Sequence, residues 1–113
     1  MVSQLHSTPM NVLGRTADGG AIVKVHGNDL GETARPGHHV VLKEVDSTLV
    51  DGALYLFATG RFRMYRRVYW TGPDTVKLEP EDGSEIGTIR LQWPDDEGEW
   101  EVLARVDKVL KPV

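Results

Sequence analysis

The sequence predicts an all-β fold, a small and strongly bent sheet or barrel of about seven short strands. Short apolar runs alternate with polar residues, and glycine or proline turn signals interrupt them every several residues. No window of eleven or more residues that lacks glycine and proline carries the apolar stripe of an amphipathic helix. At 113 residues the chain is long enough for one hydrophobic core, so a single domain is expected.

The first twenty residues are expected to form a loosely ordered arm. Their short apolar island of Met10, Val12 and Leu13 repeats with neither a helix nor a strand period. The island is expected to dock on the β-rich domain, which occupies residues 21–113.

The first three expected strands are bounded by local signals. Ala21–Val25 comes after the turn signal Asp18-Gly19-Gly20. Val40–Leu42 follows Arg35-Pro36-Gly37, whose proline and glycine suit the backbone angles of a turn. Ala53–Ala58 is apolar on both faces, which is typical of a central strand.

Four further strands complete the expected sheet. Arg61–Trp70 alternates and directly follows a Thr-Gly turn, so it is expected to form a hairpin with Ala53–Ala58. Thr75–Glu79 and Ile86–Trp93 each end at a proline, which cannot extend a ladder of backbone hydrogen bonds. In Glu99–Leu110 the apolar alternation changes phase near the C-terminal end, as a β-bulge or bend would require.

The composition excludes several kinds of protein. Thirteen basic and seventeen acidic side chains give a net charge of -4, so direct nucleic-acid binding by this chain is not expected. The chain contains no cysteine, which excludes disulfides and thiolate zinc sites and fits a cytoplasmic protein. No apolar run is long enough to span a membrane, and no signal-peptide core opens the chain. No cofactor is expected.

One face of the Arg61–Trp70 strand carries an arginine among apolar residues. Alternation places Arg66 on that face. Its apolar neighbours there are Phe62, Met64, Val68 and Trp70. An unpaired guanidinium in a core costs several kcal/mol, so a carboxylate partner is expected, and Asp29 is the candidate.

Two simpler interpretations stand beside this ion pair. The segment Asn28-Asp29 follows a glycine and suits an Asx turn that caps its own loop. Arg66 can also extend its alkyl stem along the core and place its charged head in water.

The opposite face of the same strand is basic and aromatic. Its residues are Arg61, Arg63, Tyr65, Arg67 and Tyr69. This combination resembles a platform for single-stranded nucleic acid. The alternative is that the arginines pair with the acidic segments 79–85 and 95–101, which the net acidic charge favours.

The histidines match no metal signature. His38 and His39 are neighbours that would point to opposite faces of a strand, so they cannot bind one ion together. His26, Asp29 and His38 have no known ligand spacing, and no metal is expected.

Five segments, taken in order, resemble the C-terminal domain of LexA and phage repressors. They are Gly27-Asn28-Asp29-Leu30, Arg35-Pro36-Gly37-His38-His39-Val40-Val41-Leu42, Asp51-Gly52-Ala53-Leu54-Tyr55, Tyr65-Arg66-Arg67-Val68 and Val102-Leu103-Ala104-Arg105-Val106. The family's usual pattern is Gly-Asp-Ser-Met, a Pro-Gly-Asp turn before a strand, an Asp-Gly hairpin start, a Lys-Arg pair and a final Gly-Arg-Val strand. The resemblance covers roughly residues 21–111.

This resemblance implies a β-rich domain that, in family members, dimerises and cleaves itself with a Ser-Lys dyad. The chain departs from the pattern at both catalytic positions, because Asp29 stands where the serine would be and Arg66 where the lysine would be. Arginine stays protonated in proteins and cannot act as the base. The resemblance therefore implies a degenerate, non-cleaving relative with no catalytic residue.

Three functions follow from these interpretations. The first is a homodimeric regulatory domain of a repressor-like transcription regulator, with dimer contacts from the last strand and Trp100. It would act on DNA only through an N-terminal helix-turn-helix, which is expected to lie outside this chain. The second is a self-cleaving enzyme, which the missing serine and lysine disfavour. The third is a small β-barrel module that binds a peptide or nucleic acid through the Arg61–Trp70 face.

Overall fold

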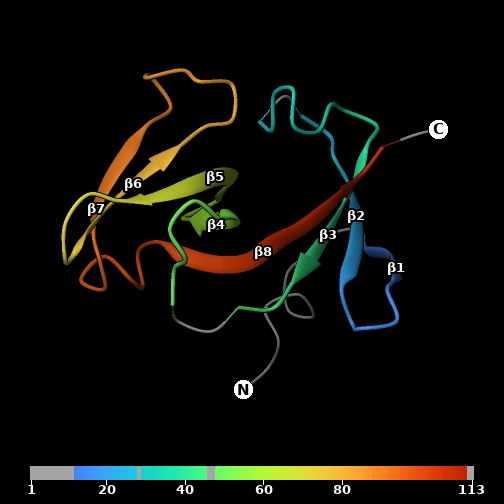
Figure 1. Cartoon of the computed structure of the whole chain (residues 1–113), viewed down its shortest axis with the longest axis horizontal. Coiled ribbons are helices and arrows are strands. Elements are labelled where there is room, and N and C mark those ends of the chain that lie inside the picture. The colour runs from blue at the N-terminus through green and yellow to red at the C-terminus, as the bar shows by residue number, and fades with distance from the viewer. Residues whose placement is uncertain (1–11, 28, 46–47, 112–113) are drawn as a thin grey trace.

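The computed structural model describes residues 12–27, 29–45 and 48–111, in which the chain forms eight β-strands (Figure 1). They are β1 (Val12–Arg15), β2 (Ala21–Lys24), β3 (His39–Lys43), β4 (Leu54–Thr59), β5 (Phe62–Trp70), β6 (Thr75–Glu79), β7 (Ile89–Gln92) and β8 (Glu101–Leu110). The predicted all-β class is confirmed. Within the described ranges, no helix is long and apolar enough to cross a membrane.

All eight strands belong to one sheet, in the order β1-β2-β3-β8-β4-β5-β6-β7, and every neighbouring pair is antiparallel. The sheet is open, because β1 and β7 are its two ends. The structure therefore has the bent sheet of the prediction and not the closed barrel. Most strands pair with their neighbours in sequence, but β8 lies between β3 and β4.

The last strand joins the two halves of the sheet. Residues 105–110 pair with β3, and residues 101–105 pair with β4. In Figure 1, β8 runs as one long curved strand between the half that contains β1–β3 and the half that contains β4–β7.

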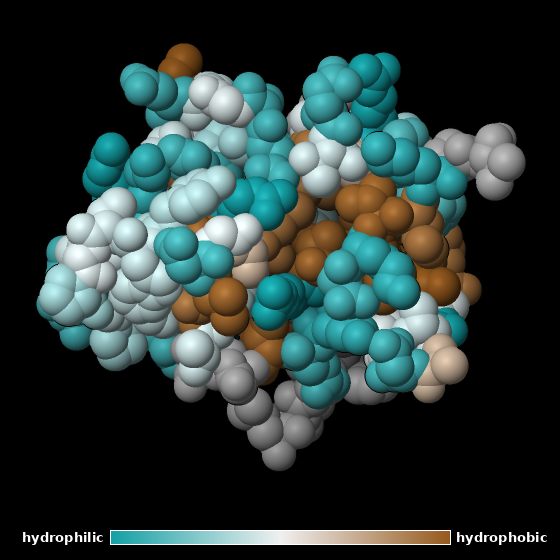
Figure 2. All heavy atoms as spheres, in the orientation of Figure 1, coloured by the Kyte–Doolittle hydropathy of each residue, from teal (hydrophilic) through white to brown (hydrophobic). Residues whose placement is uncertain are grey.

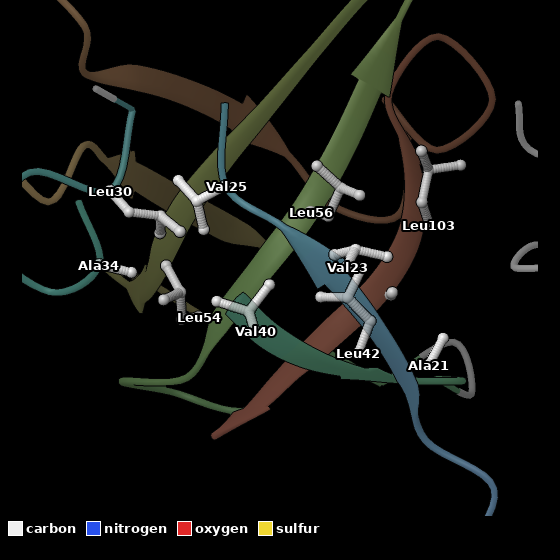
Figure 3. Close-up of a cluster of buried hydrophobic side chains, with 11 residues drawn as sticks. Ala21, Val23, Val25, Leu30, Ala34, Val40, Leu42, Leu54, Leu56 and Leu103 are labelled. Carbon is white, nitrogen blue, oxygen red and sulfur yellow. The ribbon is translucent and has the colours of Figure 1, made fainter. Parts of the chain in front are cut away.

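The bent sheet buries apolar residues in two clusters, one on each face of β4. The first cluster contains Ala21, Val23, Val25, Leu30, Ala34, Val40, Leu42, Leu54, Leu56, Leu103 and Ala104 (Figure 3). The second cluster contains Leu49, Ala53, Tyr55, Phe57, Val68, Val76, Leu78, Leu91 and Trp93. Consecutive residues of β4 alternate between the clusters, so this strand is buried on both faces, as predicted. Each large side chain that is fully buried contributes about 1.5–3 kcal/mol to stability.

Two bulges decide which residues of β8 face each cluster. The pairing with β4 skips Leu103, so Leu103 and Ala104 both join the first cluster. The pairing with β3 skips Asp107, whose carboxylate lies 3.5 Å from Lys43 Nζ. The bulge at Asp107 is the phase change predicted near the end of the strand.

The structure departs from the predicted elements in three places. Strand β1 is not among the predicted strands; it lies in the expected arm and places Val12 against the first cluster, whereas residues 1–11 of the arm are outside the described residues. The predicted strand Ile86–Trp93 is wrong over its first three residues, which form a loop with Ile86 97% exposed. Phe62 does not join the apolar face of β5, because it lies next to the hairpin turn and is 71% exposed.

Candidate functional site

The loop between β2 and β3 is folded onto the sheet. Backbone hydrogen bonds from Val25 N–H to His38 O and from Gly37 N–H to Val25 O close its base. Leu30 and Ala34 are fully buried in the first cluster, so apolar residues anchor the middle of the loop. This arrangement holds the start of the loop beside β5.

The predicted ion pair between Asp29 and Arg66 is present. Arg66 Nη1 donates to Asp29 Oδ1 at 2.7 Å, and Asp29 Oδ2 accepts the backbone N–H of Tyr65 at 2.6 Å. The Arg66 side chain is 11% exposed and the Asp29 side chain is 35% exposed. Both carboxylate oxygens therefore hold the β2–β3 loop to β5 through charge-assisted hydrogen bonds.

Arg66 also holds the loop between β6 and β7. Its Nε donates to Gly87 O at 3.0 Å, and its Nη1 donates to Tyr65 O at 2.8 Å. The alternative that places the head of Arg66 in water is therefore wrong. The Asx-turn alternative is not borne out for Asp29, whose carboxylate bonds to β5; Asn28 lies outside the described residues.

A second arginine, on the other face of β5, holds Glu81 of the β6–β7 loop, which in turn bonds to the β2–β3 loop. Arg67 forms an ion pair with Glu81, with Nε donating to Oε2 at 3.0 Å, and its Nη1 donates to Gly52 O at 2.8 Å. Thr33 donates its hydroxyl to Glu81 Oε1 at 2.9 Å. The hydrogen bond from Arg67 is the main cause that lowers the pKa of Glu81, and burial partly opposes it. The sequence gives no local signal for this partner choice.

Gly31 is a second point where the β2–β3 loop touches the β6–β7 loop. Its φ is +51°, and a Cβ there would lie 3.3 Å from the backbone of Asp82. Gly31→Ala is therefore expected to lower the free energy of unfolding by about 2 kcal/mol, through left-handed strain and a displaced loop contact. Urea denaturation measures this change.

Gly37→Ala is the matched control for Gly31→Ala. Gly37 has a φ of +93°, but no atom lies within 4 Å of the position that a Cβ would take. Only the backbone strain is expected there, about 1 kcal/mol. Equal losses in the two variants would contradict a tight contact between the loops at Gly31.

A groove of about 450 Å³ opens beside the ion pair, between the end of β2 and the first half of β5. Its lining residues are Val23, Lys24, Val25, His26, Gly27, Asp29, Leu56, Arg63, Met64 and Tyr65. Figure 2 shows apolar surface exposed between the two halves of the sheet, with hydrophilic residues around it. No sequence pattern indicates the groove, because its walls are far apart in the chain and meet only in the folded sheet.

The basic and aromatic face of β5 is not one continuous platform. Arg61 and Arg63 are exposed, and neither forms an ion pair with a described residue. Tyr65, in contrast, packs against the first cluster, and burial raises its pKa to about 12.

The remaining two residues of that face have partners within the chain. Arg67 pairs with Glu81, as predicted by the alternative in which these arginines meet acidic segments. Tyr69 lies under the ammonium of Lys77, whose Nζ is 5.9 Å from the ring centroid. The stacking surface that a single nucleic-acid strand needs is therefore interrupted.

The other candidate residues lie apart from the groove or at its rim. His38 Nδ1 accepts the backbone N–H of Arg35 at 3.2 Å, whereas His26 lies at the rim. No group of three or more metal-ligating side chains occurs in the part of the chain that the structure describes. Trp100, the expected dimer contact, is half-buried against the second cluster.

Comparison with known proteins leaves the family of this chain as a prediction. No protein-family model matches the chain, and no curated protein matches it significantly. Its function must therefore be argued from the residues and their geometry.

Proposed function

We propose that this chain is a dimerisation and regulatory domain of a transcription regulator of the phage-repressor type, without peptidase activity. The Asp29–Arg66 ion pair carries the proposal, since the resemblance to LexA puts the serine and the lysine at these two positions. The two side chains meet beside a groove, and the all-β fold is also what the resemblance implies.

The paired side chains lack the chemistry of self-cleavage. That reaction needs a hydroxyl nucleophile and a neutral amine that accepts its proton. Asp29 has no hydroxyl, and its two carboxylate oxygens already accept hydrogen bonds from β5. Arg66 keeps its proton at any physiological pH. On this proposal the scaffold serves assembly, and the ion pair fastens the loop.

The last strand offers an edge for dimerisation. Residues 106–110 pair with β3 on one side, and no described strand pairs with them on the side of β4. Two copies could pair antiparallel about a two-fold axis between Asp107 and Lys108. Each Asp107 would then lie opposite Lys108 of the second copy, and Val106 opposite Val109, which makes the segment self-complementary. Trp100, near the start of the strand, is the second candidate contact.

Sedimentation velocity tests the dimer. The chain is expected to dimerise at micromolar concentration, and either Asp107→Lys or Lys108→Asp alone is expected to weaken the dimer about tenfold, because attraction becomes repulsion. The combined variant restores opposite charges and is expected to recover the dimer. A chain that stays monomeric at high micromolar concentration would contradict the proposal. If the single and combined variants dimerise with equal affinity, the dimer contact is not at this edge, and Trp100 becomes the candidate contact.

Incubation at alkaline pH tests the absence of peptidase activity. The chain is expected to keep its full mass, as measured by mass spectrometry over days, because neither member of the pair can start the reaction. A discrete shortened product that disappears in Asp29→Ala would contradict this expectation. The Gly37→Ala variant, which leaves the pair intact, serves as the control for cleavage of loosened chains.

A further inference from the structure

We propose that the groove between β2 and β5 is a binding site for a small apolar molecule that carries a carboxylate. The proposal does not depend on the regulatory function, because it concerns only the groove and its lining.

The size and the lining of the groove suit a small apolar ligand. Its volume of about 450 Å³ lies within the range of small-molecule sites, roughly 300–1,000 Å³. Val23, Val25 and Leu56 are buried core residues that also line the groove, so its floor is rigid and apolar.

The charges around the groove favour an anion. Lys24 and Arg63 are exposed at its rim, and neither forms an ion pair with a described residue. The acidic side chain among the described lining residues, Asp29, forms an ion pair with Arg66, which offsets part of its charge. The two cations at the rim therefore outnumber the carboxylate among the described lining residues, and that carboxylate already has a partner within the chain.

Tyr65 supplies a polar group for the same ligand. It lines the groove and is half-buried, and its hydroxyl has no hydrogen-bond partner among the described residues. Burial keeps this phenol in its neutral form, in which it can donate a hydrogen bond to a carboxylate oxygen.

The strand edge beside the groove disfavours an extended peptide. Val68 exchanges backbone hydrogen bonds with the β4 side, so by alternation Arg63 and Tyr65 turn their backbone groups away from β4. A peptide strand would need these groups. Asp29 already accepts the N–H of Tyr65, and Arg66 donates to its carbonyl, so the edge is blocked after Arg63. A small ligand does not need a row of free backbone groups on β5, so the blocked edge does not prevent its binding.

Calorimetric titration with naphthoate tests the proposal, and amide NMR shifts locate the binding site. Saturable binding below millimolar concentration is expected, with shifts centred on the groove. Naphthylmethanol and naphthylmethylamine, which have the same ring without the negative charge, are expected to bind at least about tenfold more weakly. Tyr65→Phe, which keeps the ring and its packing, is expected to weaken naphthoate binding severalfold.

Arg63→Glu and Arg61→Glu form a matched pair of variants. Both arginines are exposed in the same hairpin, but only Arg63 lines the groove. Arg63→Glu is expected to weaken naphthoate binding about tenfold or more, and Arg61→Glu to leave it nearly unchanged. The proposal is overturned by absence of saturable binding, by equal binding of the uncharged or cationic probes, or by equal effects of the two variants. An acidic peptide that displaces naphthoate with higher affinity would overturn it in favour of a peptide site.

Discussion

Replacing Arg66 with alanine is expected to lower the free energy of unfolding by about 3 kcal/mol. The Arg66 side chain is 11% exposed and its guanidinium donates to Asp29, Gly87 O and Tyr65 O, so its loss removes one donor from a carboxylate and one from each of two carbonyls. Breaking a buried pair costs about 3–5 kcal/mol, and the lower end is expected because Asp29 is 35% exposed to water. Urea denaturation of the folded chain measures this loss.

A double-mutant cycle separates the ion pair from the other contacts of Arg66. Asp29→Ala and Arg66→Ala together are expected to cost about 1–2 kcal/mol less than the sum of the single losses. Arg63→Ala removes an exposed arginine of the same strand and is expected to change stability by less than about 0.5 kcal/mol. Simple additivity of the two single losses would show that the side chains do not interact.

Acid is expected to destabilise the chain through Glu81. Its pKa is lowered in the folded chain from an ordinary value of 4.5, mainly by the hydrogen bond from Arg67. Such a carboxyl contributes stability above pH 4.5, and the contribution is lost as the pH falls through the folded pKa. Glu81→Gln is expected to cost about 2 kcal/mol at neutral pH, discounted because Arg67 is 30% exposed, and to flatten the loss of stability in acid.

Glu32→Gln is the matched control for Glu81→Gln. Glu32 also pairs with an arginine, Arg35, but the two side chains are 87% and 64% exposed, so water screens the interaction. This variant is expected to change neither the stability at neutral pH nor the acid dependence appreciably. Urea titrations at a series of pH values compare the variants. An acid dependence that is the same in Glu81→Gln as in the parent chain would rule out a stabilising Glu81.

The strands could be predicted because their signals are local. Glycine and proline turns bound most of them, and β4 shows its central position through apolar residues on both faces. The Asp29–Arg66 contact could also be predicted, because an arginine among apolar residues requires a nearby carboxylate. Alternation within one strand indicates only that Arg66 needs a carboxylate, and the resemblance to LexA indicates which one, because it places Asp29 and Arg66 at the two dyad positions.

The remaining features depend on how distant segments meet. Strand β1 shows no clear period in its sequence, because Val12–Arg15 contains a glycine. It is a strand because it pairs with β2, and that pairing has an irregular register. The bulge at Leu103 is hidden because its neighbours on both sides are apolar. The groove and the ion pair between Arg67 and Glu81 form only once the loops have packed against the sheet. No spacing within a single segment encodes them.

The place of β8 in the sheet sets the time at which the chain can fold during synthesis. It is the last of the eight strands to be made, yet it lies between β3 and β4 and its residues enter both apolar clusters. The second cluster lacks Val102 until β8 has begun, and the first lacks Leu103, Ala104, Val106 and Val109 until most of β8 has left the ribosomal tunnel. The earlier strands are therefore made before the strand that covers them, and they stay within reach of chaperones and proteases until β8 follows.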